Sequence, residues 1–155
     1  MQALIKSTLV AVLGLSAFGA FAGEISNTTI DASRAKNETG SAGAQAYQYI
    51  GSTYGSGQIT NSHIYARDAH NGSFSRNGYA SQEIGVAGVG GKMNNVTVYA
   101  DRVDNGAKAS GATATQEIGK VSNGTMKNVT VWANGAVNLA TTDGSVAKQK
   151  IGVVN

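Results

Sequence analysis

The sequence predicts an all-β protein, a parallel β-solenoid of four stacked coils of about 34 residues that is uncapped at both ends. Two observations carry this prediction. A repeat fills most of the chain, with copies at 25–58, 59–92, 93–125 and 126–155. Inside each copy, apolar residues alternate with a period of two, which is typical of strands, and nowhere follow the spacing of a helix.

The repeat is defined by residues of one kind at constant offsets. The copies open at Ile25, Ile59, Met93 and Met126, so successive copies are 34, 34 and 33 residues apart, and all four contain the motif Gln-x-Ile-Gly. Two columns of aliphatic residues form the predicted core. They are Ile30, Ile64, Val98 and Val131 in a first strand, and Ile50, Ile84, Ile118 and Ile151 in a second strand.

The two strands of the third copy read "NNVTVYA" and "ATATQEIG". Val96 and Val98 are expected on one face of the first strand, and Thr97 and Tyr99 on the other. One copy buries few large side chains, at about 1.5 to 3 kcal/mol each, against a backbone entropy cost of about 1 to 2 kcal/mol per residue. We therefore expect a copy to be stable only when it is stacked on its neighbours, with the Gly-, Asn- and Ser-rich segments turning the corners.

Two columns of amide side chains run through the repeats. The glutamine column (Gln48, Gln82, Gln116 and Gln149) is expected on the inward face of the second strand. Stacked at the strand spacing of about 4.8 Å, these amides would donate and accept along the column, so that none is buried unpaired. The alternative is that they face solvent at a corner. The asparagine column (Asn37, Asn71, Asn105 and Asn138) is predicted to form a similar ladder in a turn, where asparagine tolerates left-handed backbone.

One outward column is aromatic in three of the four copies. It consists of Tyr65, Tyr99 and Trp132, with Asp31 at the equivalent place in the first copy. Such a strip is a candidate for binding a sugar or another surface. The alternative is that the rings stabilise the sheet by packing across strands.

The sequence offers little for catalysis or for metal binding. His63 and His70 lie near Asp68, but their spacing places the two histidines on different faces of an extended chain, and no further ligand recurs at equivalent offsets. No carboxylate cluster indicates a catalytic groove. We predict no catalytic residue, no metal and no cofactor, and hence no enzyme. A formal net charge of +3, scattered along the chain, also gives no reason to expect nucleic acid as a partner.

The first residues are typical of an export signal. Residues 1–22 combine Lys6, an apolar run and a small-x-small ending, as a cleaved secretory signal peptide does, so the mature domain is predicted at 23–155. The chain contains no cysteine and no proline. An exported protein of this composition is held together without disulfides, and no proline interrupts strand pairing.

Exported repeats with internal glutamine and asparagine columns resemble the curlin-like functional amyloid subunits of bacterial biofilms. This resemblance covers the mature chain. It implies stacked β-arch repeats that continue from one molecule into the next, in an extracellular or cell-surface fibre. The implied partners are further copies of the chain, joined head to tail, and an outer-membrane secretion or nucleator protein.

The ends of the repeat array agree with the same hypothesis. Soluble solenoids usually carry atypical polar caps on their outermost coils. Here the first copy starts two residues after the predicted cleavage site, and the last residues, "QKIGVVN", still follow the pattern of the second strand. We therefore expect a structural subunit of extracellular fibres. The alternative function is a surface adhesin, or a glycan-binding solenoid, that does not polymerise.

Overall fold

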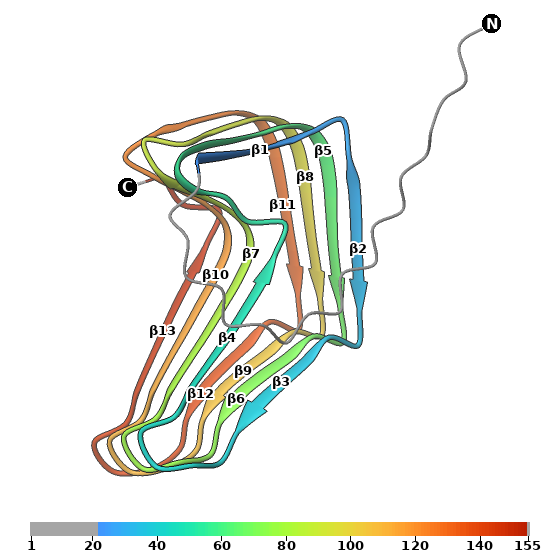
Figure 1. The fold of residues 1–155 in the computed structure, drawn as a ribbon. Coiled ribbons are helices and arrows are strands. Elements are labelled where there is room, and N and C mark those ends of the chain that lie inside the picture. Colours follow the sequence, from blue (N-terminus) through green and yellow to red (C-terminus); the bar gives the residue numbers. More distant parts are fainter. Residues whose placement is uncertain (1–21, 155) are drawn as a thin grey trace, which may run out of the picture.

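A computed structural model describes residues 22–154, and in this range every regular element is a β-strand (Figure 1). The predicted signal peptide lies almost entirely outside the described residues. The strands are β1 (Ala22–Ser26), β2 (Thr29–Ser33), β3 (Lys36–Thr39), β4 (Gln45–Ile50), β5 (Tyr54–Arg67), β6 (His70–Ser73), β7 (Tyr79–Val89), β8 (Lys92–Asp101), β9 (Asp104–Ala107), β10 (Thr113–Ser122), β11 (Thr125–Asn134), β12 (Val137–Ala140) and β13 (Val146–Ile151). No helix of this range could cross a membrane.

The strands form three parallel sheets that run along the sides of the stack. One sheet has the order β1-β5-β8-β11, with β2 also paired to β5; the others have the orders β3-β6-β9-β12 and β4-β7-β10-β13. Ile59 pairs with Met93, and Met93 pairs with Met126, which are steps of 34 and 33 residues. The predicted fold class, a parallel β-solenoid of four coils, is thus confirmed. Each coil has a third, four-residue strand that the sequence analysis did not predict.

Corners between the sheets are made by residues in the left-handed backbone region. The long strands bend at a column of asparagines, of which Asn61 has a φ of 46° and Asn95 a φ of 55°. The next corner has Arg102 at a φ of 50°, and β10 bends within the third sheet at Gly119, which has a φ of 58°. Because the same backbone conformation recurs in each coil, the coils superpose along the stack and their strands stay in register.

The core is a set of side-chain columns inside the stack, and its burial depends on the coil. Ile84 and Ile118, in the two middle coils, are fully buried, whereas Ile151 in the last coil is 40% exposed. In the first-strand column the same holds, since Val98 is buried but Val131 is only half-buried. The first coil is more covered than the last, because its Ile50 is buried and its Ile30 is half-buried.

Candidate functional site

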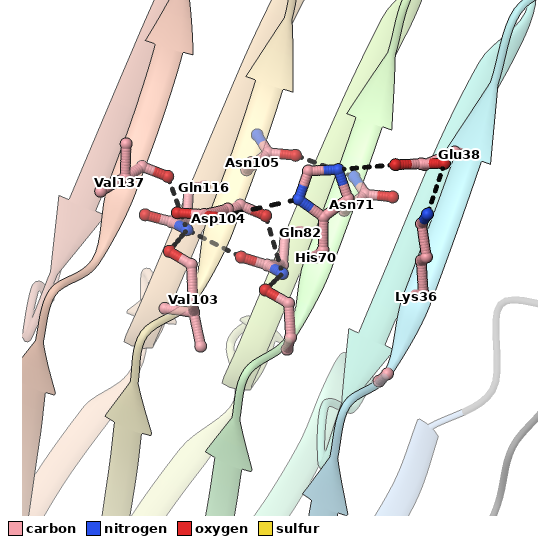
Figure 2. A network of polar contacts seen from close by, with 12 residues as sticks. Lys36, Glu38, His70, Asn71, Gln82, Val103, Asp104, Asn105, Gln116 and Val137 are labelled. Atoms are coloured by element: carbon pink, nitrogen blue, oxygen red, sulfur yellow. Dashed lines mark hydrogen bonds and ion pairs between the residues drawn. The ribbon is translucent and has the colours of Figure 1, made fainter.

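The glutamine ladder runs through the interior of the solenoid. Gln82 Nε2 donates to Gln48 Oε1 at 2.6 Å, Gln116 Nε2 to Gln82 Oε1 at 2.7 Å, and Gln149 Nε2 to Gln116 Oε1 at 2.5 Å. Figure 2 shows the bond between Gln116 and Gln82, and neither of these two side chains has exposed surface. The side chains thus face inward, and the alternative of glutamines facing solvent does not describe these two middle coils.

The orientation of each glutamine amide is determined by backbone carbonyls. Gln116 Nε2 also lies 3.3 Å from the carbonyl oxygens of Val103 and Val137, which only an N–H group can satisfy (Figure 2). Gln82 Nε2 contacts the equivalent carbonyls of Ala69 and Asp104. The Nε2 side is therefore specified, and the ladder bonds all point from a later coil to the coil before it.

The asparagine ladder is also internal, and its predicted location in a turn is wrong. Asn37, Asn71, Asn105 and Asn138 lie in the short strands β3, β6, β9 and β12. None of the four has left-handed backbone, which is found at other columns. The sequence contained a signal for this third strand, because an apolar residue stands two places before each asparagine: Ala35, Ala69, Val103 and Ala136.

The asparagine ladder points in the opposite direction. Asn37 Nδ2 donates to Asn71 Oδ1 at 3.0 Å, Asn71 Nδ2 to Asn105 Oδ1 at 2.8 Å, and Asn105 Nδ2 to Asn138 Oδ1 at 2.8 Å. Each of these bonds runs from one coil to the coil after it. Carbonyls again determine the orientation, since Asn105 Nδ2 donates to Thr115 O at 2.9 Å and Asn138 Nδ2 to Lys148 O at 2.7 Å. Two antiparallel series of amide dipoles thus run along the stack.

Within the described residues, the two end coils differ in burial: Gln149 and Ile151 of the last coil are exposed, whereas Gln48 and Ile50 of the first coil are buried and Ile25 and Ile30 are half-buried. The first coil has a hollow of about 600 Å³ whose apolar lining includes Ile25, Ile30 and Ile50. Among residues 22–154, the strands β3, β4, β12 and β13 pair on one side only. The two end faces therefore form the candidate site, and what they can bind chemically is another β-strand.

The predicted aromatic strip lies on the outside of the first sheet. Tyr99 and Trp132 are stacked, with ring centroids 5.5 Å apart and an interplanar angle of 10°, and Tyr65 lies 6.1 Å from Tyr99. Tyr65 and Tyr99 are half-buried, while Trp132 in the last coil is 55% exposed. The rings of Tyr99 and Trp132 turn their faces toward each other, so each ring uses one face for this contact. Stacking with a sugar uses a ring face, so this geometry favours cross-strand packing.

Ionisable side chains on the short strands β3, β6 and β9 lie close together. Nε2 of His70 lies 3.0 Å from Glu38 Oε1, and its Nδ1 lies 4.0 Å from Asp104 Oδ2 (Figure 2). Lys36 bonds to the same Glu38 carboxylate at 3.0 Å and is the main reason why the pKa of Glu38 is lowered. No group of three metal-ligating side chains with the arrangement of a metal site was found among the described residues, and His63 instead stacks on Tyr65.

A pair of glutamates lies on the outer face of the third sheet. Glu83 and Glu117 are register partners on neighbouring strands, and Lys120 Nζ bonds to Glu117 Oε1 at 2.8 Å. Burial raises the pKa of Glu83 to about 7, and repulsion by Glu117 adds to this effect while Lys120 opposes it. On the neighbouring strand β4, Tyr49 is the register partner of Glu83. Its ring packs edge to face on Tyr54, with ring centroids 5.3 Å apart, and burial also raises the pKa of Tyr49. Glu83 is therefore held in a place that disfavours its charged form.

We expect Glu83→Gln to stabilise the protein at pH 8 but not at pH 4. A carboxyl whose folded pKa is about 7, above its unfolded value of 4.5, makes its full contribution below pH 4.5 and loses it as the pH rises to about 7. The amide never ionises, so its free energy of unfolding at pH 8 should exceed that of the original protein by about 1 to 3 kcal/mol. Urea unfolding at both pH values measures this difference. The matched control is Glu24→Gln on the exposed edge of β1, which should show no such gain; an equal effect of Glu83→Gln at both pH values would contradict the assignment.

Comparisons with known proteins do not identify this chain. No protein-family model matches it, and neither a curated protein nor a solved structure matches it. The inference about function therefore rests on the geometry of the end faces and of the ladders.

Proposed function

We propose that the chain is a structural subunit that is exported and assembles head to tail into extracellular, amyloid-like fibres. The observation that supports this proposal best is the open pairing edge of each end coil, together with the incomplete burial of the last one. Each end coil contains the same columns as the middle coils, in the same register, yet lacks a neighbour on one side within residues 22–154. A second copy of the chain has the matching surface.

Unpaired backbone groups support addition of a strand at the last coil. Val146 N donates to Ala112 O and Gly152 N to Ile118 O, so the even-numbered residues of β13 bond to β10. Backbone groups alternate sides along a strand, and the N–H groups of Ala147 and Gln149 therefore point away from the stack. Such an edge is a template for another parallel strand, and the β4 edge of a second copy offers the complementary row.

Burial of apolar side chains favours the same junction. Stacking the first coil of one copy on the last coil of another brings Ile30 beside Val131 and Ile50 beside Ile151, by continuation of the observed register. These contacts repeat those inside the solenoid, where the equivalent isoleucines and valines are completely buried. Each junction therefore gains hydrophobic free energy at about 25 cal/mol per Å² of apolar surface, and the gain recurs with every added subunit.

The proposal predicts fibre formation by the chain from Gly23 onward. At micromolar concentration we expect unbranched fibres after a lag that shortens with concentration, and fragments of fibres should abolish the lag. Fibre diffraction should give the strand spacing of about 4.7 to 4.8 Å along the fibre axis. Electron microscopy and light scattering follow the assembly. A fully β-folded chain that stays monomeric for weeks would contradict the fibre proposal and favour the non-polymerising adhesin or glycan-binding solenoid.

A variant blocked at one end makes this test specific. Ala147→Pro removes an N–H group that no other strand of the solenoid uses, and it places a proline on an edge strand, where proline is tolerated. We expect a β-folded monomer that no longer elongates. Ala147→Ser keeps the N–H group and is the matched control, which should still form fibres.

A further inference from the structure

The two amide ladders indicate how one copy would sit on the next. We infer that they determine the polarity and the register of the junction, so that Gln48 of one copy stacks on Gln149 of another and Asn37 stacks on Asn138. This inference rests on the proposed fibre function and adds to it a specific pairing of residues. It makes a second copy of the chain, in one orientation, the partner of each end face.

In the first coil, one group of each ladder lacks its ladder partner within residues 22–154. Gln48 Nε2 contacts the carbonyls of Ala35 and His70, as the glutamines of the middle coils contact their equivalents, but within residues 22–154 it has no ladder acceptor. Asn37 Oδ1 likewise accepts no ladder bond there, since Asn37 is the first donor of its series. The ladder positions of the first end face are therefore a glutamine donor, whose side chain has little exposed surface, and an asparagine acceptor.

The last coil presents the opposite set. Gln149 Nε2 already donates to Gln116, which leaves Gln149 Oε1 as an acceptor. Asn138 Oδ1 already accepts from Asn105, and its Nδ2 contacts the carbonyls of Ala114 and Lys148 without a ladder acceptor in the described residues. The glutamine donor of one face thus meets the glutamine acceptor of the other, and the asparagine donor meets the asparagine acceptor. Two last coils placed face to face would instead set acceptor against acceptor in the glutamine column.

The ladders also discriminate between registers. A shift of β4 by one residue against β13 would turn its whole inward set of side chains outward. A shift by two residues keeps the facing but sets Gln149 opposite Ala46 or Ile50, which leaves an amide without a partner in a newly buried interface. Only the in-register junction satisfies both ladders at once.

The outer face of the same junction contains complementary side chains. Continuing the register of the third sheet brings Lys148 beside Tyr47 and Lys150 beside Tyr49. Lys148 is exposed and both tyrosines are partly exposed. A lysine ammonium beside a tyrosine ring is attracted by the ring electrons, and the interaction becomes stronger when water is excluded. Among residues 22–154, no lysine is the register partner of a tyrosine in this sheet, so these pairs are particular to the junction between copies.

Cysteine cross-linking tests the inferred register directly, because the chain has no cysteine of its own. One preparation carries Tyr47→Cys and the other carries Lys148→Cys, and the two are mixed under fibre-forming conditions with a mild oxidant. In-register neighbours on parallel strands have Cα atoms about 4.8 Å apart, which is within the range that a disulfide spans. In one molecule the two positions are three coils, or about 14 Å, apart, so the disulfide must join two copies. We expect a covalent dimer of the two variants as the main product.

Two controls isolate register and polarity. Tyr47→Cys mixed with Lys150→Cys is out of register by two residues, and Lys148→Cys alone reports last coils facing each other. Both should cross-link at least about tenfold less than the in-register pair, because their Cα atoms lie beyond disulfide reach in the inferred junction. Fibres in which either control cross-links as well as the in-register pair would overturn the inferred junction and leave the fibre proposal standing. Absence of both fibres and cross-links would overturn the proposed function together with this inference.

A further variant tests the ladder itself. Adding Gln149→Leu to the Lys148→Cys chain removes the glutamine acceptor of the last face but keeps its apolar columns and edge strand. The ratio of two yields is measured: that of the in-register dimer, divided by that of the dimer formed with the Lys150→Cys control. This ratio should fall by at least about threefold, because one of the two ladders no longer discriminates between registers. An unchanged ratio would show that packing alone sets the register.

Discussion

Gln116→Glu is expected to unfold the protein at neutral pH, whereas Gln116→Leu should leave a weakened solenoid. Gln116 has no exposed surface, and both neighbours in its ladder are uncharged glutamines. A carboxylate there would be buried without a cation and would set an oxygen against Gln82 Oε1, at a cost of about 3 to 5 kcal/mol. Leucine leaves Gln82 Oε1 without its donor, and a buried unpaired group of this kind costs about 1 to 3 kcal/mol.

Acid should partly rescue the Gln116→Glu variant. A buried carboxyl has a folded pKa above its unfolded value, so its destabilising effect is absent below the unfolded pKa of about 4.3 and grows as the pH rises. Once protonated, the introduced carboxyl group can also donate to Gln82 Oε1, as the amide does. Circular dichroism during urea unfolding at pH 4 and pH 7 measures both variants. The matched control is Gln149→Glu, at the exposed end of the same ladder, which should fold normally; equal damage at both positions would mean that burial is not the cause.

Much of the fold was predictable from the repeat, because each inward position of a coil occurs in four copies in the sequence. The inward positions of Ile84, Ile118 and Gln116 followed from alternation with a period of two. The third strand of each coil was missed for a physical reason. A four-residue strand such as β9, with the residue before it, contributes three inward positions, Val103, Asn105 and Ala107, and so short a segment with a polar residue in its middle does not show a clear period.

The corners show a second limit of prediction from the sequence, because residue type does not always indicate left-handed backbone. The glycine after each Gln-x-Ile motif is a residue type that indicates a special backbone conformation, and Gly119 has a left-handed φ of 58°. Arg102 also adopts left-handed backbone, although nothing in its residue type indicates it, because the stack imposes the same corner that Asp68 and Gly135 form in neighbouring coils.

The candidate site was predictable only in part. The sequence indicated two amide columns, but the direction of each ladder depends on which carbonyls its N–H groups meet. Those carbonyls belong to residues far from the amides in the chain, such as Val137 for Gln116 and Thr115 for Asn105. The opposite polarity of the two ladders, on which the inferred junction depends, is therefore a property of the folded coils.

The second large effect is expected at the glycine column that follows the Gln-x-Ile motif. Gly85 and Gly119 each lie against the core residue of the first strand in the next coil. A Cβ atom on Gly85 would lie 2.6 Å from Val98 Cγ2, and one on Gly119 would lie closer still to Val131 Cγ2. Gly152, in the last coil, has the same left-handed backbone with a φ of 62°, but its nearest neighbour would be Val131 Cβ at 3.9 Å.

Gly119→Ala should therefore destabilise the solenoid far more than Gly152→Ala. Both substitutions place an L-residue in left-handed backbone, which costs about 1 to 2 kcal/mol. Only Gly119→Ala also forces a methyl group into Val131, and overpacking of this kind adds about 1 to 3 kcal/mol. The free energies of unfolding of both monomers, measured in urea with Ala147→Pro present to prevent assembly, separate the two effects. If the two variants lose equal stability, the close approach of Gly119 to Val131 does not add to the loss of unfolding free energy. The glycines of this column would then be required only for their left-handed backbone.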